Sequence, residues 1–427
     1  EWLVAAFAAS KVGAITVGIS TFSTPREIAW ILDHCRPAVL VTIEAFRGRS
    51  YLTPLYELCP ELARSAPGAL RSDSFPELRA VVCVDPGRHD GVYWLGDLTG
   101  RAADVGETAL AAAQAAVAPT DLCYILYTSG STATPKGVSL AHYGVIENGF
   151  NIGERQHLTD ADRLWMAVPL FWSFGSANAL PAIMTHGGSI VLQESFEPGE
   201  ALALLDGERC SVYYGMANMA RAILEHPDRP RHRLAAMRTG LTIGLPEDIR
   251  MTMEAVGARE LCNVYGSTET YGNCAVTDAN DSLELRLHTQ GLPLPGMDFR
   301  VVDPEKAKLQ WKNLHDLLLS LGVVIHIIPP DPNAPGLVYP ANAGVLLGNQ
   351  FILSNLIPTR ANERVIYESF LKKLGYSTVS IKSRFEGEAD FFPVGDRYIF
   401  TYGGVMTQKF VPKFNLPPWT RIYGFRS

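Results

Sequence analysis

The stretch 127-YTSGSTATPKGVSLAH-142 concentrates hydroxyl groups, a glycine and a lysine within a few positions. The preceding CYILYT (123–128) has the β-branched and aromatic side chains of a strand, so SGSTATPKG is expected to follow it as a loop. Successive backbone N–H groups in such a loop can surround an anion, while Gly130 allows close approach and Lys136 supplies a positive charge. The hydroxyls come from Ser129, Ser131, Thr132 and Thr134. The stretch predicts a phosphate-binding loop, with a polar turn that binds nothing as the alternative.

Composition limits the classes of protein to which the chain can belong. With 427 residues, 47% of them hydrophobic and 19% charged, it is long enough for two or three domains. The net charge of −7 and the lack of a basic stretch argue against nucleic acid as the main partner. The seven cysteines are scattered and form no CxxC pair, which predicts reduced thiols in a cytoplasmic protein.

The apolar first segment, EWLVAAFAASKVGAITVGI, has the composition of a signal peptide or a membrane span. Lys11 interrupts the run and no basic region precedes it, so we favour a buried helix over 1–11, a turn at Gly13 and a strand in AITVGI. Because the chain starts at Glu1 and opens inside a domain, we expect a fragment without a membrane span.

The charge balance changes abruptly near Glu305. Residues 1–305 contain 23 Lys and Arg against 36 Asp and Glu, whereas residues 306–427 contain 14 against 8. Asp303-Pro304-Glu305 has the residues of a helix start, the leucines that follow recur near helical period, and Gly322 can end the helix. The apolar run VVIHII after it predicts a buried strand. We therefore place a domain boundary at about 303–306.

Helical and strand patterns alternate on both sides of this boundary, which predicts an α/β fold with a largely parallel sheet before it. The expected strands there are AVLVTI, CYILYT, SIVLQ and SVYYG, and the expected helices include PREIAWILDHC and EALALLDGE. After the boundary we expect a helix over 361–374 and strands near 337–339, 344–354, 376–381 and 397–402.

The loop and several later segments resemble, in order, the motifs of the adenylate-forming superfamily of acyl-CoA synthetases, luciferases and peptide-synthetase adenylation domains. The loop resembles the signature YTSG-[ST]-TG-x-PKG. The other matching segments are VSLAH, VPLFWSFGSANALPAIMTHGGSIVL, RTGLTIGLPEDI, NVYGSTET and QGLPLPGMDFRVVDPE. The resemblance covers residues 1–305 and implies the large amino-terminal AMP-binding domain of this superfamily, truncated at both ends.

The resemblance implies a ligase that joins a carboxylate to ATP as an acyl-adenylate and then to coenzyme A. The residues that it implies around the β- and γ-phosphates are Thr128, Ser129, Gly130, Ser131, Thr132 and Lys136. Thr268 would bind the α-phosphate, Glu269 would hold Mg²⁺, and the Gly244 loop, Tyr265 and Gly266 would line the adenine side. Without the resemblance, Glu269 would be a solvated carboxylate and Tyr265 a packing aromatic.

The acyl substrate is expected at Phe171, Trp172, Phe174 and Gly175, where the family lines its substrate tunnel. Aromatic walls with a glycine suit an apolar acyl group, although ordinary core packing is the alternative for each residue. No charged residue falls in this stretch to recognise an amino acid. We therefore expect a fatty or aryl carboxylate and a role in fatty acid metabolism.

The sequence departs from the superfamily at two levels. Ala133 replaces a glycine of the loop signature, which costs about 1–2 kcal/mol if that position needs a positive φ. After residue 305 we find no Gly-Glu-Leu strand, no Thr-Gly-Asp segment for the ribose and no small carboxy-terminal domain with the lid lysine. We therefore expect impaired activity, and a catalytically inactive nucleotide- or acyl-binding protein is the alternative.

Residues 306–427 resemble a different family, the guanidino-group-modifying enzymes that include amidinotransferases. The similarity lies in DPNAPGLVYPANAGVLLGNQFILSN and RFEGEADFFPVGDRYIFTYGG, and it implies part of a propeller of ββαβ units. Glu386 and Asp390 would grip a guanidinium, or would form a solvated acidic turn. The family's nucleophilic cysteine is missing, because no cysteine follows Cys274.

The two resemblances meet at VDPE (302–305), which suggests a fusion or a sequence-assembly artefact. Two incomplete domains would leave apolar faces uncovered, so self-association is a further expectation.

Overall fold

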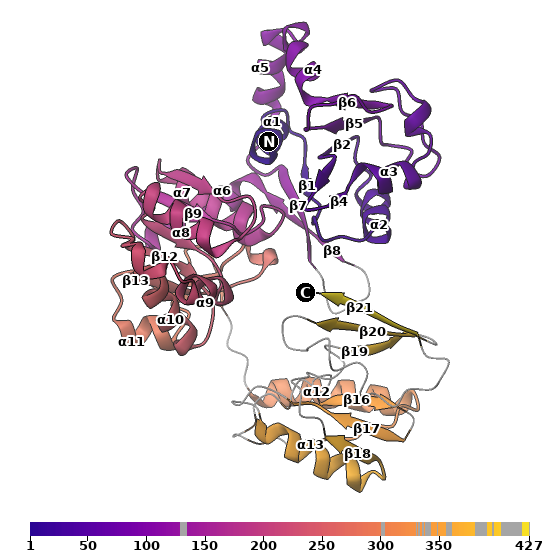
Figure 1. Cartoon of the computed structure of the whole chain (residues 1–427), viewed down its shortest axis with the longest axis vertical. Coiled ribbons are helices and arrows are strands. Elements are labelled where there is room, and N and C mark those ends of the chain that lie inside the picture. The colour runs from indigo at the N-terminus through magenta and orange to yellow at the C-terminus, as the bar shows by residue number, and fades with distance from the viewer. Residues whose placement is uncertain are drawn as a thin grey trace. The chain divides into compact units, whose positions relative to one another are not determined.

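The computed structural model describes residues 1–128, 135–299, 304–329, 331, 334, 337, 343–347, 349–355, 361–380, 391–394, 397–402 and 421–426 (Figure 1). Contacts within the chain divide it into two units, Glu1–Arg300 and Val301–Ser427. Each unit is described by itself.

The chain starts with helix α1 (Trp2–Lys11), a turn at Gly13 with φ +73°, and strand β1 (Thr16–Gly18). The helix, turn and strand predicted for this segment are therefore confirmed, but the helix is not buried as predicted, because only Ala6 in it is buried and Val4 is 67% exposed. In the part of the chain that the structure describes, no helix has both the length and the apolar character that crossing a membrane requires.

A small parallel sheet in unit 1 is formed by β2 (Val39–Thr42), β5 (Ala80–Cys83) and β6 (Val92–Trp94). Helix α2 (Pro25–Cys35) begins with a capping box, in which the Glu27 N–H donates to the Thr24 hydroxyl and Glu27 accepts from the Thr24 N–H at 2.6 Å. Helix α3 (Leu52–Leu58) packs against α2, and the two-stranded pair β3 (Ala45–Phe46) and β4 (Arg49–Ser50) precedes it. Their shared core contains Leu32, Leu55, Leu62, Leu78 and Val81.

A second three-stranded sheet has the order β1–β7–β8. Strand β7 (Leu122–Thr128) runs parallel to β1 and antiparallel to β8 (Lys136–Ala141). Because Thr128 lies opposite Lys136, the stretch between them is the connection of a β-hairpin. Helix α5 (Glu107–Ala116) precedes β7, and α6 (His142–Arg155) follows β8 directly.

The largest sheet has seven strands in the order β10–β9–β11–β12–β13–β14–β15. Its parallel strands are β9 (Arg163–Met166), β10 (Ser189–Leu192), β11 (Val212–Tyr214), β12 (Thr239–Thr242) and β13 (Glu260–Tyr265). Two short antiparallel strands, β14 (Ala275–Val276) and β15 (Leu292–Pro293), complete it. This arrangement confirms an α/β fold with a largely parallel sheet.

The helices that connect these strands are α7 (Leu180–Thr185), α8 (Pro198–Gly207), α9 (Ala217–Glu225) and α10 (Pro246–Val256). The order along the sheet reverses after β10, and right-handed crossovers therefore put α7 on one face and α8, α9 and α10 on the other. Helix α6 packs against α7, α8 packs against α9, and α9 packs against α10 (Figure 1). The central strands are covered on both faces, so most of their residues are buried whether apolar or polar, and Trp165, Tyr213 and Tyr214 are fully buried.

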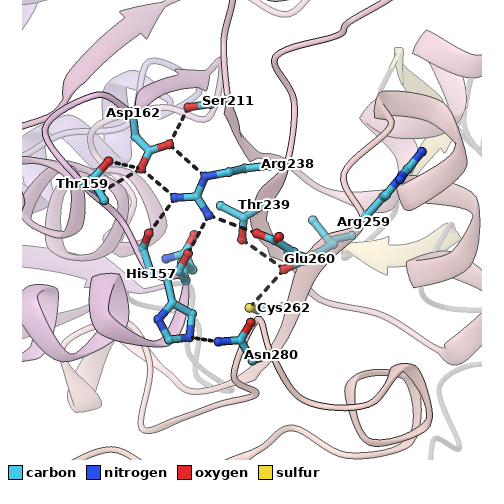
Figure 2. A network of polar contacts seen from close by, with 12 residues as sticks. His157, Thr159, Asp162, Ser211, Arg238, Thr239, Arg259, Glu260, Cys262 and Asn280 are labelled. Atoms are coloured by element: carbon cyan, nitrogen blue, oxygen red, sulfur yellow. Dashed lines mark hydrogen bonds and ion pairs between the residues drawn. The ribbon is translucent and has the colours of Figure 1, made fainter.

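A network around Arg238 ties together the amino ends of four neighbouring strands (Figure 2). The Arg238 guanidinium donates to both oxygens of Asp162, at 3.1 and 2.7 Å, and to Glu260 Oε2 at 3.1 Å. Ser211 donates to Asp162 Oδ1 at 2.7 Å, and its own hydroxyl accepts from the Arg163 N–H. Asp162, Ser211 and Arg238 precede β9, β11 and β12, and Glu260 begins β13.

Unit 2 contains α12 (Pro304–Ser320), the strands β16 (Gly344–Leu347), β17 (Gln350–Leu353) and β18 (Ser377–Ser380), and α13 (Ala361–Lys373). Strand β17 pairs antiparallel with β16 and parallel with β18, and α13 packs on β17 and β18. The chain order is therefore ββαβ. A further sheet is formed by β19 (Phe391–Val394), β20 (Arg397–Tyr402) and β21 (Arg421–Arg426).

The strand expected in VVIHII is wrong, because residues 323–328 form neither helix nor strand. Val324 is 77% exposed, so this apolar run is also not buried as predicted. A run of apolar residues becomes a strand only where a partner strand meets it, and none does here among the described residues. The strand expected near 337–339 lies almost wholly outside the described residues.

The Arg238 network leads to a prediction about stability. Burial raises the pKa of Asp162, but hydrogen bonds from Arg238 and Ser211 outweigh it and leave this pKa lowered. The carboxylate therefore stabilises the fold above about pH 4, the ordinary Asp range, and this stabilisation is lost as the pH falls through the lowered pKa. We expect Asp162→Asn to lower the free energy of unfolding at pH 7 by about 2–4 kcal/mol, and the loss to shrink in acid.

Urea unfolding of the wild type and of Asp162→Asn at pH 7 and pH 3.5 measures this effect. Asp160→Asn, on an exposed residue two positions away, is the control and should change stability by less than about 0.5 kcal/mol. Equal losses in the two variants would contradict the assigned role of the network.

Candidate active site

The residues predicted from the sequence gather at the carboxyl edge of the seven-stranded sheet. The segment 171–175 follows β9, Gly244 follows β12, and Gly266 and Thr268 follow β13. In open α/β sheets, ligands bind outside the carboxyl ends of parallel strands. The Arg238 network occupies the opposite edge, so one end of these strands is fixed by ion pairs and the other carries the candidate site.

Thr268 begins a short 3₁₀ turn, Thr268–Thr270, after β13. Its hydroxyl lies 3.0 Å from the hydroxyl of Ser173, in the segment after β9. Thr268 is half-buried, whereas the neighbouring Glu269 is exposed. The structure thus brings the predicted α-phosphate residue against the predicted acyl segment.

The chain around Thr268 is held by Asn148 of α6, which is 4% exposed. Its Nδ2 group donates to the carbonyl oxygens of Tyr271 at 3.0 Å and Asn273 at 2.9 Å, with a longer contact to Thr270 at 3.4 Å. Tyr271 has φ +56°, an unfavourable conformation for a residue with a Cβ. Sequence reasoning missed Asn148, because nothing in its spacing distinguishes it from a solvated residue on an amphipathic helix.

Gly266 allows this turn to close. A Cβ at Gly266 would lie 2.3 Å from the carbonyl oxygen of Gly272 and 2.4 Å from the Asn273 Cα. Any larger residue would separate the two sides of the loop 266–273. Gly266 therefore has a structural role, the closure of this loop, in addition to the nucleotide contact predicted for it.

The predicted phosphate loop is only partly described. Ser129, Gly130, Ser131, Thr132 and Ala133 lie outside the described residues. Thr128 and Lys136, which flank them, are Cα partners in the β7–β8 pair, and Lys136 is exposed. Strand β8 also contacts the turn Thr268–Thr270, and Tyr271 after this turn packs near Leu140, at the end of β8 away from Lys136.

An aromatic cluster holds β7 just before the loop starts. The Tyr127 hydroxyl lies 2.7 Å from Nδ1 of His34, at the end of α2. The Trp30 ring stacks on His34 with centroids 4.7 Å apart and meets the Tyr127 ring edge-on at 5.7 Å. Burial, followed by the neighbouring Cys35, raises the pKa of Tyr127, so this residue stays a neutral phenol.

The residues expected on the adenine side lie in two separate loops. Gly244 lies between β12 and α10, and a Cβ there would be 2.8 Å from the Asp248 Cβ. Tyr265 is 58% exposed, and its ring meets that of Phe299 with centroids 6.5 Å apart. An exposed aromatic face at the carboxyl end of β13 can stack against a planar base.

The predicted acyl residues differ in their surroundings. Phe171 is buried, with its backbone against Gly18 of β1, and Phe174 packs against Tyr214 with centroids 5.3 Å apart. Gly175 leaves no room for a Cβ, which would lie 2.7 Å from the Pro169 carbonyl. Only Trp172 of these four is exposed, at 47%. Packing therefore explains part of this segment without a ligand.

An open depression of about 670 Å³ lies elsewhere, along α6. Its lining includes His142, Ile146, Phe150 and Thr185 and none of the predicted site residues. We give more weight to the edge of the sheet, because an open and mostly apolar hollow has few groups to orient a charged substrate.

No group of three or more His, Cys, Asp and Glu side chains suited to a metal ion occurs within the described ranges. Glu269 is a single exposed carboxylate. Mg²⁺ commonly needs only one or two protein carboxylates when substrate phosphates supply further oxygens. Glu269 therefore fits a metal that arrives with a nucleotide, and not a resident metal site.

Comparison with known proteins decides the family. Residues 1–313 match the family described as AMP-binding enzyme. The chain belongs to this family. Family membership accounts for the ordered motifs of residues 1–305 and for the α/β fold.

Two curated relatives share this region. The protein named "Putative acyl-CoA synthetase YngI" of Bacillus subtilis (strain 168) is 33% identical over 325 residues, which are 75% of this chain and 59% of that protein. "Medium-chain acyl-CoA ligase ACSF2, mitochondrial" of Mus musculus is 30% identical over 338 residues, 76% of this chain and 54% of that protein. The chain thus spans between half and three fifths of the length of these relatives.

The fold is similar to the crystal structure of the anthranilate CoA ligase AuaEII in complex with anthranoyl-AMP. The TM-score is 0.59 at 24% identity, over 71% of this chain and 54% of that one. The ATP-bound MatB from Rhodopseudomonas palustris has a TM-score of 0.54 at 22% identity, with the same two coverages. These likenesses support the fold of an adenylate-forming amino-terminal domain.

The contacts of Asn148 lead to a second prediction. Asn148→Ala removes the donor shared by the carbonyls of residues 270, 271 and 273, so we expect a loss of about 1–3 kcal/mol in unfolding free energy. Amide hydrogen exchange should become faster in 266–274, because the loop loses its attachment to α6. Asn151→Ala, on the same helix, is the control. Equal exchange in this loop for both variants would show that Asn148 does not hold it.

Proposed function

We propose that this chain activates a carboxylate with ATP, giving an acyl-adenylate and pyrophosphate, and passes the acyl group to the thiol of coenzyme A. One observation carries the proposal. The turn with Thr268 and the segment 171–175 meet through the contact of the Ser173 and Thr268 hydroxyls at the carboxyl edge of the sheet, in a member of the AMP-binding enzyme family.

In the proposed reaction, a carboxylate oxygen attacks the α-phosphorus and the bond to the bridging oxygen of pyrophosphate breaks. Thr268 would donate to an α-phosphate oxygen, while Lys136 and the loop 128–132 would hold the leaving phosphates. Fixed donors favour this step because they stabilise charge where it develops. Mg²⁺ held by Glu269 would neutralise part of the phosphate charge.

We propose a fatty or aryl acid as the substrate. The segment from Phe171 to Gly175 has three aromatic side chains and no charge, which favours an apolar acyl group over an amino acid. Two of the proteins named above are a medium-chain acyl-CoA ligase and an anthranilate CoA ligase, and a fatty or aryl acid is in keeping with these two names. Of the aromatic side chains in this segment, Trp172 is the most exposed and therefore the most accessible to such a substrate.

Residues 306–427 do not resemble the lid domain that supplies a lysine to the adenylation transition state in this superfamily, so no such role is proposed for this stretch. Nucleotide binding without turnover is the competing proposal, and a cytoplasmic location is proposed for either. The two differ in one measurable reaction, the exchange of labelled pyrophosphate into ATP.

We predict carboxylate-dependent ATP–pyrophosphate exchange in the wild type, highest with medium-chain fatty or aryl acids. Thr268→Ala should reduce the exchange rate by about 10²-fold, because one donor to the transition state is lost. Glu107→Gln, on the exposed surface of α5, is the control and should leave the rate unchanged. Stabilisation by ATP without exchange for any acid would establish the competing proposal.

For unit 2 we propose a guanidine-binding module related to amidinotransferases. The ββαβ order of β16, β17, α13 and β18 supports this proposal, since that family is built from such units. The carboxylates proposed to grip the guanidinium, Glu386 and Asp390, lie outside the described residues. The family's reaction is not proposed, because the sequence after Cys274 contains no cysteine.

Arginine is expected to raise the melting temperature of the full chain, and Glu386→Gln should remove this shift because it deletes one proposed charge partner of the guanidinium. Differential scanning fluorimetry with arginine, and with glycine as the ligand that lacks a guanidinium, measures it. An equal shift with glycine would contradict guanidine recognition.

A further inference from the structure

The hydrogen bond between Ser173 and Thr268 connects two parts of the sheet edge that are not neighbours. Ser173 follows β9 and Thr268 follows β13, and strands β11 and β12 lie between them. The two hydroxyl oxygens are nevertheless 3.0 Å apart, across 95 positions of sequence. The segment after β9 therefore reaches across the carboxyl edge to the turn that carries Thr268.

The direction of this bond matters for anion binding. Each hydroxyl has one hydrogen to donate, and for neither side chain do the described residues provide a second hydrogen bond. If Thr268 donates to Ser173, its only hydrogen is used. If Ser173 donates, the hydrogen of Thr268 is free to point at a phosphate oxygen, and the two bonds strengthen each other.

The same segment touches the Thr268 loop at a second point. Asn178, on the π-helix Phe174–Ala179, lies against Gly272, where an added Cβ would be 3.2 Å from the Asn178 Cβ. Asn178 is fully buried and accepts from the Tyr214 hydroxyl at 3.2 Å. Between these two contact points lies Phe174, whose ring packs on Tyr214.

We propose that Ser173 is a positioning residue, which donates to Thr268 and thereby directs the Thr268 hydroxyl toward the α-phosphate. Because Ser173 lies between Trp172 and Phe174, an acyl group that packs on these aromatics also fixes the donor of Thr268. Acyl recognition and phosphate recognition are then linked through one hydrogen bond. This inference rests on the proposed function, which supplies the α-phosphate as the ligand of Thr268.

The test compares the affinities of AMP and adenosine, which differ only in the α-phosphate, by titration calorimetry on the full chain. The wild type should bind AMP more tightly than adenosine. Ser173→Ala should reduce this AMP preference about three- to tenfold, the value of one hydrogen bond, while adenosine affinity stays within about twofold. Ser173→Thr keeps the hydroxyl and should retain the preference. Thr268→Val is the reference for complete loss of the contact.

Two results would overturn the role of Ser173. One is an unchanged AMP preference in Ser173→Ala when Thr268→Val lowers it, and the other is a wild type that binds AMP and adenosine equally. If Ser173→Ala does not fold, Ser173→Cys keeps the size with a weaker donor and should show a smaller AMP preference than Ser173→Thr.

Pyrophosphate exchange separates this inference from the proposed function. A wild type without exchange, but with an AMP preference that depends on Ser173, would refute the ligase and support the positioning role. With exchange present, Ser173→Ala should lower kcat while the KM for ATP changes little, and Ser173→Thr should restore kcat. A purely structural role of Ser173 would instead lower stability and leave kcat of the folded fraction unchanged.

Discussion

The large sheet of unit 1 depends on the register of its parallel strands. The guanidinium of Arg238 joins four of these strands at their amino ends. A parallel sheet cannot set its register with hairpin turns, since each strand returns only after a helix. Asp162, Ser211, Arg238 and Glu260 each stand at the start of a different strand, and hydrogen bonds join them around one side chain (Figure 2). An arginine suits this position, since its planar fork binds a carboxylate through two parallel bonds.

Unfavourable terms occur at both edges of the sheet. Asn148 Oδ1, Asn178 Nδ2 and Asn273 Nδ2 at the carboxyl edge are buried and have no hydrogen-bond partner among the described residues, and neither have Gln156 Oε1 and Arg163 Nε at the amino edge. Each such atom costs about 1–3 kcal/mol relative to a paired one. Tyr271 adds a left-handed backbone conformation in the same loop. His157, Arg209 and Leu234 have positive φ near the amino edge as well, so these terms do not by themselves mark the functional edge. The Arg238 network and the buried strands offset them at both edges.

Local patterns in the sequence predicted the elements but not the contacts between them. Helix α2 was predictable because Pro25 and the residues after it carry a helical pattern, and strands β10 and β11 because they are short apolar runs. The role of Asn148 was not predictable, since it depends on carbonyls more than 120 positions away. The Ser173–Thr268 bond has the same origin. The strand predicted in VVIHII was wrong for a related reason, because β-branched residues favour a strand only when another strand lies beside them.

The Arg238 network fixes the amino ends of the strands, and the candidate site lies at their carboxyl ends. Stability and chemistry therefore depend on different residues. Strand β13 has six residues, so Glu260 and Tyr265 lie about 16 Å apart at 3.3 Å per residue. Arg238 is paired with two carboxylates, which offset its charge at the amino edge. None of these side chains contacts Thr268 among the interactions of the described residues, so the network acts first on the strands that it joins. Substitutions at the amino edge should act on folding alone, whereas those in the segment after β9 act on the geometry of Thr268, because that segment is what contacts it.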